Sequence, residues 1–290
     1  MDRLARFEAH RPRLLGLAYR LLGEASEAED VVQETYLRWD AATGVEMPEA
    51  WLTKVVTNLC LNRLTSARAR RETYTGPWLP EPVFTDRGEL GPLETAEQRD
   101  TLSLGMLVLL ERLTPPERAA FVLREAFGYS HREIGEILDR DEAHVRQLCR
   151  RARQHVGEGR KRFPASPEDR RRITERFLAA AVEGDVPALE RLLAADVVAW
   201  SDGGGKVTAA RRPVSGRDKV ARYLTGLARD PRMAAMTVEP RWVNGECGVV
   251  IRQSGTLFAV LVPEPGEDGL VALHTMLNPD KLTFAGSQKA

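Results

Sequence analysis

The sequence predicts a protein of several domains, in which two all-α domains, the second containing a helix-turn-helix, precede an α+β domain. Its 290 residues exceed the length of one small domain. Apolar residues follow helical spacing up to about residue 160, and short runs typical of strands occur only after that point. Proline and glycine cluster at residues 73–92, and two prolines occur at residues 164–167. We therefore expect domains at residues 1–72, 93–163 and 164–290, with residues 73–92 as an acidic linker.

The first domain is expected to consist of helices only. Apolar residues at positions 14–22 follow helical spacing, and Gly23 ends that helix. Ser26 and Glu29 form a capping-box pattern, which predicts a second helix through about residue 41. Pro48 suits the first turn of a third helix. Trp51 lies in phase with the apolar residues of that helix, so core packing is favoured over a base-stacking role.

The second domain ends in a helix-turn-helix. A helix is expected from about residue 93 to residue 113, and Thr114–Glu117 and Ser130–Glu133 form capping boxes for the next two helices. Val145, Leu148 and Ala152 form the apolar stripe of a helix over residues 141–153. Asp139 stands in the turn, where the backbone is expected to be left-handed.

The opposite side of this last helix carries side chains that bind nucleic acid. Arg and Gln make bidentate contacts to base edges and phosphates, so the helix is expected to enter a DNA major groove. The alternative is a solvated basic helix in an ordinary bundle. The outward residues are His144, Arg146, Gln147, Arg150, Arg151 and Arg153.

Charge is distributed unevenly along a chain whose formal net charge is zero. Residues 145–162 are strongly basic, whereas residues 76–100 are acidic. The sequence therefore predicts a local nucleic-acid footprint within a neutral protein, with an acidic linker beside it.

Cysteine usage and hydropathy exclude several classes of protein. Cys60, Cys149 and Cys247 are too far apart in sequence for a zinc motif or a disulfide framework, so a reducing cytoplasm is expected, with no metal and no cofactor. The N-terminus lacks an apolar signal core, and the most apolar run, residues 102–113, is too short to span a bilayer. We expect a soluble protein without membrane contact, monomeric when free.

The third domain changes pattern. Helices are expected at about residues 167–183, 186–194 and 218–229. Runs typical of antiparallel strands cover residues 197–201, 236–243, 249–253, 256–262 and 270–277. This order predicts an α+β domain with a curved sheet.

Three motifs in this order resemble a bacterial sigma factor of the extracytoplasmic-function type. They are Ala28–Trp39, Ala50–Leu64, and Leu113–Arg118 followed by the helix-turn-helix. The resemblance covers residues 1 to about 160, and the tail from about Ser166 resembles a SnoaL-like domain, which is a cone-shaped barrel. Three further strings resemble the sigma-factor group with that extension: Trp78, Leu79, Pro80, Glu81 and Pro82; Asp202, Gly203, Gly204, Gly205 and Lys206; and Asn278, Pro279, Asp280, Lys281 and Leu282.

The resemblance implies promoter recognition together with core RNA polymerase, which makes the polymerase and promoter DNA the expected partners. The helix at residues 141–153 would bind the minus-thirty-five element as duplex. With the loop at residues 42–47, the minus-ten strand would be held by Lys54, Asn58, Asn62 and Arg63. The polymerase clamp would contact Asp30, Gln33, Glu34 and Leu37. That face could also be merely solvated, but the apolar Leu37 within it favours a partner.

The role of the tail domain is open between an enzyme, a sensor and a clamp. Asp202, His274 and Asp280 are candidate acid–base groups, yet no catalytic constellation can be assembled, so the protein is not expected to be an enzyme. The glycines at 203–205 do not fit a phosphate loop, because Trp200 and Val207 stand where that motif needs other residues.

A turn that admits another chain segment is the better interpretation of these glycines. The resemblance points to the linker around Trp78–Pro82 and to a tail that regulates the sigma domains in cis. The alternatives are a one-component helix-turn-helix regulator with a ligand-sensing tail, and an enzyme fused to a DNA-binding module. Whether the tail takes a small-molecule ligand stays open.

Overall fold

The computed structural model describes residues 3–86, 90, 96–157 and 166–288. Its contacts divide the chain into two compact units, Met1–Thr73 with Arg87–Arg160, and Tyr74–Asp86 with Lys161–Ala290. Most of the expected linker therefore packs with the C-terminal domain. The expected helix start at residue 93 and the boundary at residues 163–164 lie outside the described residues.

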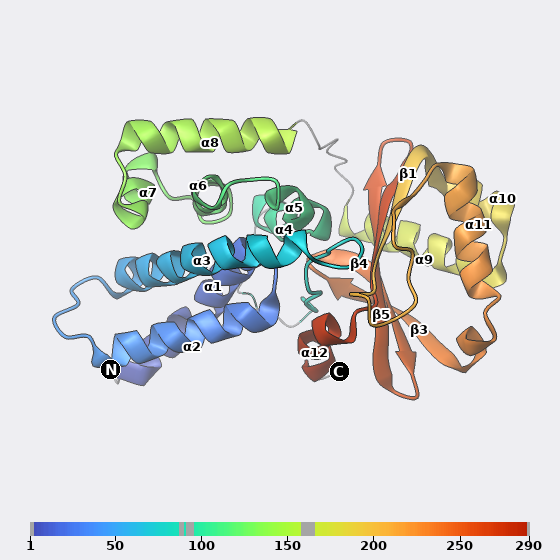
Figure 1. Ribbon diagram of the computed structural model, residues 1–290, viewed down its shortest axis with the longest axis horizontal. Helices are drawn as coiled ribbons and strands as arrows, with labels where there is room; N and C mark the ends of the chain where they lie inside the picture. The colour runs from blue at the N-terminus through green and yellow to red at the C-terminus, as the bar shows by residue number, and fades with distance from the viewer. Residues whose placement is uncertain (1–2, 87–89, 91–95, 158–165, 289–290) are drawn as a thin grey trace. The chain divides into compact units, whose positions relative to one another are not determined.

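Three long helices begin the first unit: α1 (Arg3–Leu22), α2 (Ala25–Ala41) and α3 (Pro48–Glu72) (Figure 1). Gly23 ends α1 with a left-handed φ of 72°, and its N–H donates to Tyr19 O at 2.7 Å. The sequence-based start of α2 at Ser26 is wrong. The backbone of Glu24 is extended, and Glu24 is the N-cap residue, although its side chain makes no cap hydrogen bond. The helix therefore begins at Ala25.

Among the described residues of this unit, five shorter helices follow: α4 (Ala96–Leu102), α5 (Leu104–Leu110), α6 (Pro115–Glu125), α7 (His131–Leu138) and α8 (Glu142–Gly157). The single helix expected up to residue 113 is broken at Ser103. Ser103 has an extended ψ of 146°, and its hydroxyl accepts a hydrogen bond from Met106 N, so it ends one helix and caps the next. The expected capping boxes of α6 and α7 are both present.

The turn of the helix-turn-helix is left-handed, as expected. Asp139 has φ 55° and ψ 54°, and its N–H donates to Gly135 O. Gly135 itself lies so close to the turn that an added Cβ would stand 2.6 Å from Arg140 O. The small residue and the left-handed residue together set the sharp angle between α7 and α8 (Figure 1).

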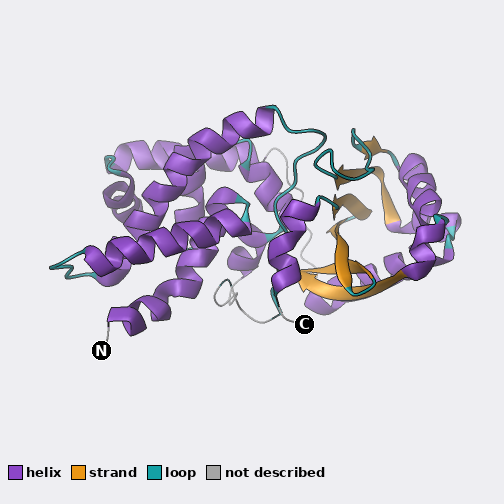
Figure 2. Ribbon diagram, turned by 60° about the horizontal axis from the view of Figure 1, so that its bottom comes forward, coloured by secondary structure: helices purple, strands orange, loops and turns teal. Residues whose placement is uncertain are grey.

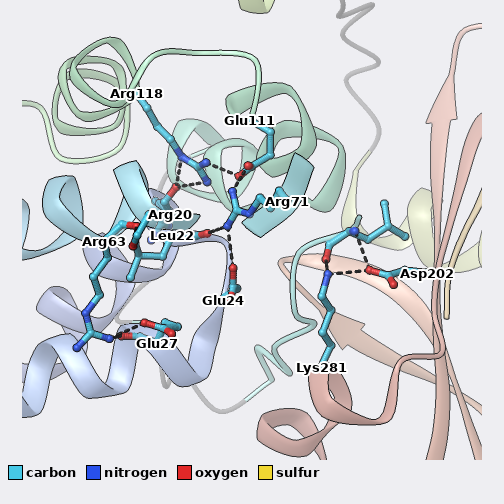
Figure 3. Close-up of polar contacts among 12 residues, drawn as sticks. Arg20, Leu22, Glu24, Glu27, Arg63, Arg71, Glu111, Arg118, Asp202 and Lys281 are labelled. Atoms are coloured by element: carbon cyan, nitrogen blue, oxygen red, sulfur yellow. Dashed lines mark hydrogen bonds and ion pairs between the residues drawn. The ribbon is translucent and has the colours of Figure 1, made fainter. Parts of the chain in front are cut away.

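A buried polar network joins the helices of the first unit (Figure 3). Glu111 bonds both Arg71 of α3 and Arg118 of α6. Arg118 is 2% exposed and also donates to Arg20 O, while burial lowers its pKa to about 9. Arg20 in turn donates to Thr101 Oγ1 at 3.1 Å. These bonds connect α1 and α3 to the helices of the second expected domain.

The described residues of the second unit form a six-stranded sheet with helices (Figure 2, strands in orange). Its helices are α9 (Pro167–Glu183), α10 (Val186–Leu192), α11 (Arg217–Ala228) and α12 (Pro279–Ser287), with a 3₁₀ turn at Pro231–Ala235. Its strands are β1 (Leu193–Asp202), β2 (Val214–Ser215), β3 (Met236–Val243), β4 (Glu246–Gln253), β5 (Thr256–Gly266) and β6 (Gly269–Met276).

The sheet has the order β2-β1-β6-β5-β4-β3. Neighbouring strands are antiparallel except β1 and β6, which pair in parallel, with Ala199 opposite Leu273. The expectation of an antiparallel sheet is therefore wrong for this central pair. β6 is the last strand of the antiparallel β3–β6 meander, and it lies beside β1 in the same direction.

One face of the sheet carries the core of the second unit. Phe177 of α9, Leu189 of α10 and Leu224 of α11 pack against sheet residues such as Val197 and Leu261. α12 and the segment Tyr74–Asp86 lie on the other side of the sheet (Figure 1). In the described part of the chain, no helix is long and apolar enough to cross a membrane.

Candidate nucleic-acid interface

Helix α8 presents the basic surface that the sequence predicts. Val145, Leu148 and Ala152 are buried in the first unit. Asp141 Oδ1 accepts a hydrogen bond from His144 N at 2.7 Å and so supports the first turn. All six outward residues are exposed: His144, Arg146, Gln147, Arg150, Arg151 and Arg153.

These cations are not equally available to a ligand. Arg146 pairs with Glu142 at 2.5 Å, and the bond from Arg146 lowers the pKa of Glu142. Arg153 pairs with Glu125 at 2.7 Å. Within the described residues, Arg150 and Arg151 have no acidic partner. A polyanion would therefore meet Arg150 and Arg151 first and must displace a carboxylate to reach the other two.

Helix α3 carries the polar face expected to hold the minus-ten strand. Lys54, Asn58 and Asn62 are exposed at a spacing of four residues, which places them along one side of the helix. Lys54 Nζ donates to Glu136 O of α7 at 2.8 Å. Thr53 Oγ1 lies 3.1 Å from Tyr129 OH, next to the same contact. The end of α7 thus occupies part of this face.

Arg63 does not lie with these three residues. Its guanidinium lies 2.6 Å from Glu27, 3.9 Å from Asp30 and 3.7 Å from Glu34, all on α2 (Figure 3 labels Glu27). The sequence assigned Arg63 to the minus-ten face. In the structure its side chain pairs with the acidic residues of α2.

The face of α2 assigned to the polymerase is largely exposed to solvent, although Glu34 pairs with Arg38 at 2.7 Å and with Arg63. Asp30 and Gln33 are exposed, Glu34 is half-buried, and Leu37 is 68% exposed. Leu37 is therefore accessible to a partner, although a single exposed apolar side chain is common on protein surfaces.

Trp51 is half-buried, and its ring lies 5.8 Å from that of the buried Trp39. It packs at the edge of the core, so the structure agrees in part with the core role expected from its helical phase.

In the second unit, the chain segment Tyr74–Asp86 is fastened around Asp202, which is fully buried. Its carboxylate accepts hydrogen bonds from Tyr74 OH at 2.6 Å and Leu79 N at 2.8 Å. It also pairs with Lys281 at 2.7 Å (Figure 3). Burial, together with the bond to Asp202, raises the pKa of Tyr74, so this hydroxyl stays a donor. We call these four residues with Trp78 the linker clasp.

Lys281 is the cation of the clasp and is 6% exposed. Its Nζ donates to Leu79 O at 2.6 Å and lies 4.2 Å from the centre of the Trp78 ring and 4.6 Å from that of Tyr74. A desolvated ammonium held by a carboxylate, a carbonyl and two aromatic faces has its interactions satisfied on every side.

The glycines after Asp202 leave room for the incoming segment. Gly204 has φ +59°, and an added Cβ would overlap the Asn278 amide and stand 3.0 Å from Tyr74 OH. A Cβ on Gly205, at φ +73°, would stand 3.2 Å from Thr75. Lys206 pairs with Asp280 at 2.5 Å on the surface. The glycines therefore contact residues just before the Trp78–Pro82 string.

Further along, the segment is joined to the edge strand β3 by an isolated bridge. Val83 N donates to Asn244 Oδ1 at 3.0 Å, Asn244 N donates to Val83 O at 2.9 Å, and Phe84 bridges to Val243 of β3. Pro80, Glu81 and Pro82 are buried between these two anchors. Tyr74 and Asn244 were missed from sequence. An Asn-Gly pair at residues 244–245 signals a hairpin turn, but nothing local signals the contact it makes.

The candidate acid–base groups do not share one set of contacts. Asp202 belongs to the clasp, and Asp280 belongs to the surface ion pair with Lys206. His274 lies in β6 and is 4% exposed, and its Nδ1 lacks a hydrogen-bond partner among the described residues. Burial lowers the pKa of His274 to about 4. No group of three or more metal-binding side chains occurs in the ranges that the structure describes.

The chain was compared with known families and proteins. It matches sigma-70 region 2 over residues 6–70, sigma-70 region 4 over residues 104–156 and the SnoaL-like domain over residues 174–274. It is 39% identical to the ECF RNA polymerase sigma factor SigJ of Mycobacterium tuberculosis, over 97% of this chain and 93% of SigJ. It is 29% identical to the probable ECF RNA polymerase sigma factor SigI of that species, over 96% of this chain and 94% of SigI.

Its fold is similar to the crystal structure of SigJ, with a TM-score of 0.78 and 36% identity, covering 99% of this chain and 100% of the other.

Proposed function

The chain belongs to the extracytoplasmic-function RNA polymerase sigma factors, and we propose that it binds core RNA polymerase and directs initiation at promoters with two separate elements. The observation that best supports this proposal is that one chain carries both the exposed basic face of α8 and the exposed acidic face of α2. The match to sigma-70 region 2 favours this function over a one-component regulator, which needs no such domain.

In this proposal α8 enters the major groove of the minus-thirty-five element. Arg150 and Arg151 are the primary contacts, because neither has an acidic partner among the described residues. Arg146 contributes after its carboxylate partner Glu142 is displaced, at a cost typical of an exposed ion pair. Gln147 and His144 complete the contacts to base edges.

Single-strand capture at the minus-ten element is assigned to Lys54, Asn58 and Asn62. Lys54 donates to the last turn of α7 in this conformation, so the strand must replace a protein carbonyl with a phosphate. A phosphate carries a full charge and the carbonyl only a partial one, which favours the exchange once DNA is present.

The polymerase clamp is assigned to Asp30, Gln33, Glu34 and Leu37. Leu37 supplies apolar area, and the carboxylates supply orientation toward a basic partner surface.

The C-terminal domain is assigned a regulatory role in cis and no catalytic one. It holds residues 74–86, the connection between the two sigma regions, by the linker clasp. Restricting this connection limits the positions that the two regions can take, and tethering keeps the clasp effective even when each contact is weak. His274 is buried, and among the described residues no hydrogen bond joins it to Asp202 or Asp280, which gives an acid–base role no supporting geometry.

Run-off transcription with purified core polymerase tests the proposal. The full chain is compared with Arg150→Gln and with the clasp variant Lys281→Met. We expect core-dependent transcripts from the full chain, weaker initiation with Arg150→Gln, and altered promoter selection or output with Lys281→Met. If the unaltered chain neither binds core polymerase nor supports any transcript, the proposed function is wrong. If Lys281→Met leaves output unchanged at all promoters, the regulatory role is wrong.

A further inference from the structure

A second basic surface lies outside both sigma regions. Residues 206–232 hold eight basic and two acidic side chains, in a chain whose formal charges cancel. This density is comparable to that of the α8 tract, yet the residues belong to the second unit and to the loop, strand and helix around β2 and α11.

Half of these cations have partners within the domain. Lys206 pairs with Asp280, Arg222 with Asp218 and Arg232 with Asp230. Arg217 Nε donates to Leu193 O at 2.8 Å and is part of the packing of α11. The remaining four are exposed and lack an acidic partner in the described ranges, and we call them the basic face: Arg211, Arg212, Lys219 and Arg229.

The fold keeps the basic face together. Val220 and Leu224 of α11 are buried, whereas Lys219 on the helix and Arg229, its C-cap residue, are exposed to solvent. The two residues are ten positions apart, so they span about 15 Å along the helix axis. Arg211 and Arg212 precede β2, the edge strand, and β2 contacts α11.

Charge and shape favour duplex DNA as the occupant. Duplex DNA presents one negative charge per about 1.7 Å of its axis, so cations spread over about 15 Å meet several phosphates. Single-strand binding needs aromatic platforms, and none of the four residues is aromatic. The nearby Tyr223 is half-buried and bonds Ser201 at 3.2 Å.

We propose that the basic face of the C-terminal domain binds the phosphate backbone of duplex DNA, independently of sequence, as a contact additional to those of the sigma regions. This rests on the proposed function, because a chain that already holds promoter DNA through α8 presents further duplex at high effective concentration. The C-terminal domain then adds affinity and leaves base selection to α8.

The test measures binding of the full chain to a fluorescent duplex of random sequence over a salt series. Arg211→Gln/Arg212→Gln and Lys219→Gln/Arg229→Gln are compared with Arg171→Gln/Arg176→Gln, which removes two exposed cations of α9. Each phosphate contact contributes about 0.9 to the slope of log affinity against log salt. We expect each basic-face pair to lower the slope by about 1.8 and to weaken binding at least about tenfold at 0.1 M salt, with the α9 control unchanged.

The proposal is overturned if the basic-face variants and the control behave alike, or if the unaltered chain does not bind duplex even at low salt. The same variants are also measured for binding to vesicles of anionic lipid. If the basic-face variants lose binding only to these vesicles, and their duplex binding curves are unchanged, the proposal is also overturned. Run-off transcription with the same preparations separates the two proposals. Failure of the unaltered chain to direct transcription contradicts the sigma function, whereas unchanged salt slopes contradict only the basic face.

Discussion

Replacing Lys281 by Met should release residues 74–86 from the C-terminal domain. The change removes the cation that bonds Asp202 and Leu79 O and leaves a fully buried carboxylate without its charge partner. Breaking a buried ion pair from one side costs about 3–5 kcal/mol. Asp202 keeps hydrogen bonds from Tyr74, Leu79 and Gly204, so we expect the lower end, about 3 kcal/mol.

Hydrogen exchange of the peptide at residues 79–84 measures this cost. The amides of Leu79, Val83 and Phe84 all donate to side chains of the C-terminal domain, so they exchange only when the segment opens. A loss of about 3 kcal/mol corresponds to about 150-fold faster exchange.

Lys206→Met is the matched control. Lys206 also pairs with an aspartate, Asp280, but both side chains are more than half exposed, at 54% and 63%. We expect less than about fivefold faster exchange from the loss of such a surface pair. Adding Asp202→Asn to Lys281→Met should restore part of the protection. If Lys281→Met and Lys206→Met accelerate exchange equally, the clasp does not hold the segment.

Three further predictions concern single residues. Arg150→Gln should weaken promoter binding by about 1–3 kcal/mol with relaxed preference at one base pair, whereas a uniform loss with a shallower salt slope in a titration would mean a phosphate contact. Asp139→Gly should raise the free energy of unfolding by up to about 1 kcal/mol in urea denaturation, because glycine adopts the left-handed turn without strain; a loss of stability would refute this. The folded pKa of His274, about 4, lies below its ordinary value of 6.5, so the unfolded chain binds the proton more tightly. Stability should therefore fall as pH drops from 6.5 toward 4, by about 2 kcal/mol at pH 5, and His274→Leu should abolish this dependence in urea midpoints measured at both pH values.

The helical half of the fold could be predicted from sequence because its signals are local. The capping boxes of α6 and α7, the left-handed Asp139 and the buried stripe of α8 all follow from residues within a few positions of one another. The errors arose where a local signal had a competitor. The N-cap residue of α2 is Glu24 and not Ser26, and Ser103 interrupts an apolar run that is helical on both sides.

The contacts of the second unit could not be derived in the same way. β1 and β6 pair in parallel although some 70 residues separate them, and no periodicity reports that choice. α12 was not expected as a helix, although Asn278 and Pro279 are a good N-cap and first-turn residue. One contact of the first unit also lacked a local signal. Arg63 was assigned to DNA because of its place on α3, and only the packing of α2 against α3 shows its carboxylate partners.

The distance in sequence between the two halves of the linker clasp sets an order of events during synthesis. Leu79 and Lys281 are 202 residues apart. A ribosome adding about 5–20 residues per second needs roughly 10–40 s to pass from one to the other. Leu79, Val83 and Phe84 therefore leave the ribosome long before the surface that buries them exists. During synthesis the nascent chain therefore passes through an interval in which both sigma regions have been synthesised and the segment that connects them is still unrestrained.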